Sequence, residues 1–342
     1  MRYVREQLVP GALSDVAGPH ALRVRVLVMN NQRGGASSSG GALPPPTPHA
    51  AFEALEALEC LGGCDALERD GHAVRVSRAA ESRVLLARNG RPLASDGDDL
   101  GSANVPGFRV RQQARDVTDL LELAHALFGH EGGGPRGEQA EDGALSRLPS
   151  GGAPAPGRMA VYMVMEDDFR LCPRGLESLA FLLARARVLL PAWNALRVSY
   201  GLNGALVRGF DVPLLAQHYR ESLRRRPPDH LLVEWFAGER AESRLVKAGR
   251  PHGAFRYNLL EHFGLTSSLR AAASGVYPFC YQLLDDKVVF EVEAFRLDQC
   301  AHEQLWPCMP SAGPFAATER TPTDIDFEAL QRDGPATSLQ KW

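Results

Sequence analysis

The sequence predicts an α/β fold in which helices flank a mixed β-sheet, with Gly/Pro-rich insertions between the elements. Apolar runs of strand length, such as residues 159–165, occur along the chain with segments whose apolar residues recur at helical spacing. Stretches rich in glycine, serine and proline separate these elements. The 342 residues are enough for one large or two modest domains with a sizeable core.

In the first third of the chain, the patterns predict strands and one helix. Residues 22–29 alternate and then become wholly apolar, which predicts a first core strand. Residues 49–61 repeat Ala, Leu and Glu at helical spacing and predict a helix. Short strands are expected at 74–76 and 84–86, and an alternating strand at 108–111.

A second helix is expected to begin at Asp116, as its N-cap, and to continue through Phe128 with an apolar stripe of leucines. Two segments without periodicity interrupt the pattern. Residues 34–48 are rich in Gly, Ser and Pro and predict a loop, and residues 132–157 predict a disordered insertion.

Residues 159–165 form an apolar run that ends directly in Glu166, Asp167 and Asp168. We expect a central buried strand that delivers these acids to its C-terminal edge, where open α/β sheets bind ligands. Three adjacent carboxylates repel one another, so a cation or hydrogen-bond donors should offset their charge. Such oxygen ligands suit Mg²⁺ or Mn²⁺ with a substrate phosphate. A solvated acidic turn or a helix N-cap is an equally good interpretation of the triplet alone.

After the acids, a helix is expected from Pro173, and strands at 196–200 and 205–208 flank a tight glycine turn. Asp211 is expected to cap a helix that carries Pro213 in its first turn. A further strand is expected at 288–295, where apolar residues alternate.

Composition excludes some partners. The net charge is −3 and the chain has no long basic tract, which argues against nucleic acid or an anionic membrane as the main partner. No run reaches the roughly 18 apolar residues of a membrane span, so no membrane segment is expected in this chain. The six cysteines allow three disulfides of undetermined connectivity, and free buried thiols are at least as good an interpretation.

Three features in a fixed order resemble a known family. They are the strand with Glu-Asp-Asp at 159–168, the strand, turn, strand and Pro-Pro-Asp helix at 196–236, and Leu-Leu-Glu-His-Phe-Gly-Leu-Thr-Ser-Ser-Leu at 259–269. Together they resemble the N-acetylglucosaminyltransferase IV family over residues 108–270. The resemblance implies a GT-A fold, a Rossmann-like mixed sheet. It also implies inverting, metal-dependent transfer of a sugar, expected to be GlcNAc, from a UDP-sugar to a hydroxyl of a glycan or glycoprotein, in the Golgi lumen.

On this resemblance, residues 21–310 would be a GT-A-like catalytic domain that contains the 132–157 insertion. Residues 1–20 would be an N-terminal extension, and residues 311–342 a loosely structured tail.

The resemblance also implies roles for the acids. Asp168 would bind Mn²⁺ or Mg²⁺, with His262 as a second ligand, since neutral imidazole suits Mn²⁺. Asp167 would contact the ribose or a metal-bound water, and Glu166 the nucleoside. The alternatives are a structural acid for Glu166 and a structural histidine for His262.

Three further polar residues are candidates for donor binding. Ser267 and Ser268 follow Gly264 closely and suit a turn whose hydroxyls meet phosphate oxygens. Asn203, in the glycine turn, would donate to a sugar hydroxyl, or it would be a left-handed turn residue.

The acceptor proton needs a carboxylate base, and the helix expected at 230–236 offers two candidates. Asp229 and Glu234 would lie about 140° apart around that helix, so we expect only one to face the site. Asp229, as N-cap after two prolines, is the better candidate, and its alternative role is that of the cap alone. Glu234 is expected to face solvent. Trp235 is expected to lie in the core and not to stack on a sugar.

Two other classes of function remain open. The first is a non-catalytic GT-A-like module that binds a nucleotide or a glycan. The second is a metal-dependent phosphohydrolase. It would need more histidines than the sequence offers and a second strand that ends in acids, which the sequence lacks.

Overall fold

The computed structural model forms two compact units, one of residues 1–129 and 219–228 and the other of residues 130–218 and 229–342. The residues that the structure describes are 26–31, 50–78, 84–91, 106–128, 160–262, 278–301, 303–308, 325–327, 329 and 330. Several expectations lie outside them, namely the extension 1–20, the loop 34–48, the insertion 132–157, Ser267 and Ser268, and most of the tail 311–342.

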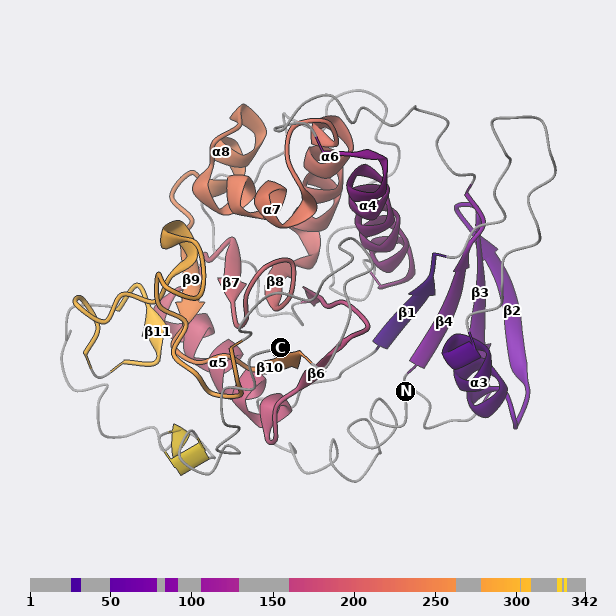
Figure 1. Ribbon diagram of the computed structural model, residues 1–342, viewed down its shortest axis with the longest axis horizontal. Helices are drawn as coiled ribbons and strands as arrows, with labels where there is room; N and C mark the ends of the chain where they lie inside the picture. The colour runs from indigo at the N-terminus through magenta and orange to yellow at the C-terminus, as the bar shows by residue number, and fades with distance from the viewer. Residues whose placement is uncertain are drawn as a thin grey trace. The chain divides into compact units, whose positions relative to one another are not determined.

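The first unit is built on a four-stranded mixed sheet with the order β1-β4-β3-β2 (Figure 1). Its strands are β1 (Val26–Asn30), β2 (Cys64–Arg69), β3 (His72–Ser77) and β4 (Val84–Asn89). The pair β1 and β4 is parallel, whereas β3 is antiparallel to both β2 and β4.

Two helices cover the two faces of this sheet. Helix α3 (Ala50–Glu59) packs Phe52 and Leu55 against Leu86 and its neighbours on one face. Helix α4 (Phe108–Phe128) packs Leu123 and Leu127 against Ala87 and its neighbours on the other. Because successive strand side chains point to opposite faces, β4 supplies both cores, and the unit has three layers.

The strands expected at 74–76 and 84–86 and the helix expected at 49–61 are confirmed in this unit. The strand expected at 108–111 is wrong, and so is Asp116 as an N-cap, because α4 begins at Phe108. Over only four residues, an alternation of apolar and polar side chains fits one turn of a helix as well as a strand. Arg111, which alternation would expose, is buried and donates to the carbonyl of Pro106 at 2.7 Å.

The second unit contains a five-stranded sheet with the order β11-β9-β7-β8-β5. The strands are β5 (Val161–Val164), β7 (Ala195–Arg197), β8 (Ala205–Arg208), β9 (His252–Phe255) and β11 (Leu305–Trp306). Only β7 and β9 are parallel among these pairs. A separate antiparallel pair joins β6 (Phe169–Leu171) to β10 (Leu260–His262) (Figure 1).

The expectation that residues 159–165 form the central strand is wrong. Among the described strands, β5 pairs with β8 alone and lies at an edge of its sheet. Its residues Val161 to Met163 are only partly buried, whereas every residue of β7, β8 and β9 is buried. An apolar run records burial, and it does not record how many neighbours a strand has.

Along the chain, helical segments separate the strands of this second unit. They are α5 (Gly175–Leu189), η3 (Gly209–Asp211), α6 (Val212–Ser222), α7 (Pro228–Ala237), α8 (Ala241–Lys247) and η4 (Glu291–Glu293). The strand expected at 288–295 is wrong, because turns and η4 occupy that segment. Its alternation has another cause: the Glu293 carboxylate is buried against Arg197, while Val289 and Ala294 join an apolar cluster.

The six cysteines form three disulfides, Cys60–Cys64, Cys172–Cys280 and Cys300–Cys308. Of the two interpretations that the sequence allows, the structure therefore shows the paired one. Cys172–Cys280 joins residues 108 positions apart and is buried at both ends. In the part of the chain that the structure describes, no helix is both long enough and apolar enough to cross a membrane.

Candidate metal-binding site

The acidic triplet lies in the connection between β5 and β6. The N–H of Phe169 donates to the carbonyl of Glu166 at 3.3 Å, which closes a turn and directs the chain into β6. Strand β6 pairs with β10 in a register that places His262 opposite Phe169. The residue before β6, Asp168, is thereby brought beside the last residue of β10.

This pairing produces the contact that the sequence analysis expected. The Nε2 atom of His262 lies 3.0 Å from Oδ2 of Asp168, although the two residues are 94 positions apart. The imidazole also packs its ring against Phe169, with centroids 4.8 Å apart. The prediction that His262 lies near Asp168 is confirmed.

The other carboxylate oxygen of Asp168 is less well satisfied. Its Oδ1 atom is buried, and no hydrogen-bond partner for it occurs among the described residues. The side chain as a whole is 35% exposed and that of His262 is 10% exposed. A buried carboxylate oxygen without a donor is costly unless something else compensates it.

Glu166 is held by Asn203 through two hydrogen bonds in opposite directions. The amide Nδ2 of Asn203 donates to Glu166 Oε2 at 2.7 Å, and the backbone N–H of Glu166 donates to Asn203 Oδ1 at 2.7 Å. The side chain of Asn203 is buried, and its two hydrogen bonds hold Glu166 in position. The alternative of a left-handed turn residue is wrong, because Gly201 and Gly204 take the positive φ angles.

Burial raises the pKa of the Glu166 carboxyl above its usual value. The nearby negative charges of Asp168, Asp167 and Asp229 raise it further, and the hydrogen bond from Asn203 lowers it. The charges of three other carboxylates therefore act on Glu166. Asp229 of α7 belongs to this group although it is remote in sequence.

A buried guanidinium fixes the turn that carries Asn203. Nη1 of Arg197 donates to the carbonyls of Gly201 and Asn203, each at 2.9 Å, and Nη2 contacts the Glu293 carboxylate. Both side chains of this ion pair are almost fully buried. Sequence reasoning missed Arg197. The signal was an arginine within a strand that is otherwise apolar.

The two candidate bases differ in exposure. Asp229 is partly exposed and lies in the first turn of α7, which begins at Pro228, and its Oδ1 accepts the N–H of His230 at 2.9 Å. Asp229 is thus inside the helix and not its N-cap. Glu234 is fully buried, so the expectation of a solvent-facing acid is wrong. Trp235 is also fully buried, which confirms its place in the core.

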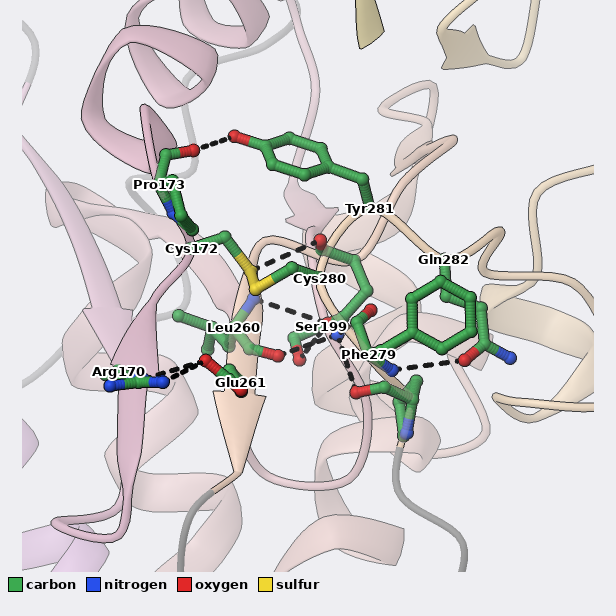
Figure 2. Close-up of a disulfide and its surroundings, with 12 residues drawn as sticks. Arg170, Cys172, Pro173, Ser199, Leu260, Glu261, Phe279, Cys280, Tyr281 and Gln282 are labelled. Atoms are coloured by element: carbon green, nitrogen blue, oxygen red, sulfur yellow. Dashed lines mark hydrogen bonds and ion pairs between the residues drawn. A yellow bond between two sulfur atoms is a disulfide. The ribbon is translucent and has the colours of Figure 1, made fainter. Parts of the chain in front are cut away.

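A covalent and polar network anchors the antiparallel pair of β6 and β10, and Figure 2 shows the part of it around the Cys172–Cys280 disulfide. The N–H of Cys172 donates to the carbonyl of Leu259 at 2.9 Å, next to the Cys172–Cys280 disulfide. The buried amide of Asn258 donates to the carbonyls of Leu260, Pro278 and Phe279. The ends of β6 and β10 are therefore fixed to the segment that begins at Pro278.

The residues at the site fit a divalent cation in their chemistry. Asp168 offers carboxylate oxygen and His262 offers imidazole nitrogen, and Oδ1 of Asp168 lacks a donor. Within the described ranges, no group of three or more His, Cys, Asp or Glu side chains is placed to hold a metal. A cation here would therefore rely on two protein ligands, as Mg²⁺ and Mn²⁺ sites do when substrate phosphate and water complete the shell.

Comparisons with protein-family models, with curated proteins and with solved structures found no match to this chain. The mixed sheets flanked by helices are those of an α/β fold.

Proposed function

We propose that this protein is an inverting, metal-dependent glycosyltransferase of GT-A type that uses a UDP-sugar, with GlcNAc as the expected sugar. The observation that carries this proposal is the contact of Asp168 with His262, close in sequence to Glu166, on which the charges of Asp167, Asp168 and Asp229 act. A divalent cation at this place would stabilise the negative charge of a departing diphosphate.

Each residue of the group has a distinct part. Asp168 and His262 would hold Mn²⁺ or Mg²⁺ through oxygen and imidazole nitrogen. Asp167, which is exposed, would contact the ribose or a metal-bound water. Glu166, fixed by Asn203, would contact the nucleoside side of the donor.

We assign the general base to Asp229. Its carboxylate is partly exposed, and its charge acts on Glu166, so it lies within electrostatic reach of the acids. Glu234 is fully buried and could not receive a proton from an acceptor hydroxyl without a large movement of α7. Direct displacement on the sugar, assisted by one base, inverts the anomeric carbon.

The acceptor would be a glycan or glycoprotein, and the compartment the Golgi lumen. Three disulfides support a chain that folds in an oxidising compartment, since such bonds are rare in the cytosol.

A screen of nucleotide sugars by thermal shift tests this proposal. With Mn²⁺ present, UDP-GlcNAc should raise the melting temperature of the wild type more than GDP-mannose does, and chelation should abolish the shift. Glu177→Gln, at an exposed ion pair with Arg174, is a matched control that should behave as the wild type. If no nucleoside diphosphate sugar produces a metal-dependent shift, the proposed function is wrong.

A further inference from the structure

An exposed aromatic ring lies next to the proposed base. Phe290 is 43% exposed, and its ring lies edge-on to that of His230, with centroids 5.0 Å apart and planes at 73°. His230 follows Asp229 directly, and its backbone N–H donates to the Asp229 carboxylate. The exposed ring of Phe290 therefore packs on the residue whose backbone N–H binds the Asp229 carboxylate.

The backbone that carries Phe290 is fixed. Val289 before it is buried, and Glu293 after it is held by Arg197. Arg197 also holds the carbonyl of Asn203, whose side chain holds Glu166. A continuous series of buried contacts thus connects the segment of Phe290 to the acidic group.

Electrostatic interactions also link these residues. Burial raises the pKa of the Glu293 carboxyl, and the charge of Asp229 raises it further, whereas that of His230 lowers it. The charge of Asp229 also acts on Glu166. Asp229 therefore lies within reach of both Glu166 and the segment of Phe290.

This combination suits a pyranose ring. A sugar has a face of C–H groups that packs on an aromatic ring and a rim of hydroxyls that donate to carboxylates. Trp235 is fully buried and cannot serve in this way. A rigid platform also costs little ordering on binding.

We propose that Phe290 is the platform on which a pyranose ring of the acceptor glycan stacks, with a hydroxyl of that ring donating to Asp229. The identity of the ligand as an acceptor rests on the proposed glycosyltransferase function. Stacking of a glycan on Phe290 does not require that function, because a glycan-binding module would use the same ring.

The test compares three variants with the wild type on an immobilised array of oligosaccharides built from pyranose units. The best-bound oligosaccharide is then titrated in solution. Phe290→Ala removes the ring, and Phe290→Trp keeps an aromatic surface. Phe279→Ala is the matched control, because Phe279 is 44% exposed and lies beside Cys280.

We expect Phe290→Ala to weaken oligosaccharide binding by about tenfold or more, while Phe290→Trp and Phe279→Ala retain it. Equal binding by Phe290→Ala and the wild type would overturn the proposal. Absence of oligosaccharide binding by the wild type, or an equal loss in Phe279→Ala, would overturn it as well.

Titration of UDP with Mn²⁺ in the same variants separates this proposal from the enzymatic one. Phe290→Ala should bind UDP as the wild type does. If oligosaccharide binding depends on Phe290 but no variant binds UDP, the platform is supported and the glycosyltransferase is not. If UDP binds and oligosaccharides do not, the reverse holds.

Discussion

Buried and partly buried acids occur in two kinds of surroundings in the second unit. Glu293 is paired with Arg197, and Asp211 is paired with Arg250, whose Nη1 lies 2.8 Å from Oδ1. The acids after β5 have neutral or titratable neighbours instead. Glu166 binds the amide of Asn203, and Asp168 binds the imidazole of His262.

The difference shows in the causes of the pKa shifts. Burial raises the pKa of all three carboxyls of Glu166, Asp211 and Glu293. An arginine opposes that rise at Asp211 and Glu293. At Glu166 the hydrogen bond from Asn203 opposes it, and the charges of three carboxylates add to it, one of which, Asp229, also raises the pKa of Glu293. The first pattern is that of a structural ion pair. In the second pattern, neighbouring acids raise the pKa of a carboxyl further, as often happens at functional sites.

The largest effect is expected where an acid of the second kind is neutralised. Asp229→Asn keeps the shape of the side chain but cannot accept a proton. Turnover of the UDP-sugar should fall by about 10² to 10⁴, with a nearly unchanged melting temperature, in assays of initial rate. Turnover that survives in Asp229→Asn and collapses in Glu234→Gln would transfer the role to Glu234.

An acid of the first kind should instead affect stability. Arg197→Met leaves Glu293 buried without its partner and frees two carbonyls, so the free energy of unfolding should fall by about 3–5 kcal/mol in urea titrations. Arg174→Met, which breaks the exposed pair with Glu177, should cost less than about 1 kcal/mol. Similar losses in the two variants would contradict the structural role assigned to the buried pair of Arg197 and Glu293.

Loss of the amide that positions Glu166 should have an intermediate effect. Asn203→Ala removes both hydrogen bonds between residues 203 and 166 and should destabilise the protein by about 1–3 kcal/mol. Gln282→Ala is the control, because its Oε1 accepts the N–H of Phe279 at an exposed position. A variant Asn203→Ala as stable as Gln282→Ala would show that the amide does not hold Glu166 in solution.

The smallest effect concerns pH. Because the pKa of Glu166 is raised in the folded protein, its neutral form is the favoured one, and its contribution to stability is present below about pH 4.5 and is lost as pH rises through the raised value. Glu166→Gln stays neutral, so the excess of its melting temperature over that of the wild type should grow as pH rises from about 4.5 through the raised pKa and then level off. A constant difference across this range would contradict the raised pKa.

The sequence predicted local structure well where one pattern applied. The strands around residues 74 and 84 and the strand at 205–208 occur as expected, whereas β7 ends at Arg197 and covers only the start of the strand expected at 196–200. It failed at 108–111 and 288–295, where buried polar side chains, Arg111 and Glu293, imitate the outward positions of a strand. Alternation of polar and apolar residues predicts a strand only if the polar residues are exposed. A charged residue that is buried with a partner makes this prediction wrong.

The candidate site was predicted in part. The contact of His262 with Asp168 was expected from a motif and is present, because the pairing of β6 with β10 joins them. The link between Asn203 and Glu166, and the arginine that fixes it, depend on long-range packing that no local pattern encodes. Ser267 and Ser268 lie outside the described residues and stay predictions.

Calorimetric titration of UDP in the presence of Mn²⁺ tests most directly whether Asp168 and His262 form a metal–diphosphate site. The wild type should bind UDP only with the metal, and Asp168→Ala and His262→Ala should each lower the affinity by on the order of 100-fold. Glu177→Gln should bind as the wild type does. Equal UDP affinity in Asp168→Ala and the wild type, with both proteins folded, would contradict the role assigned to these acids.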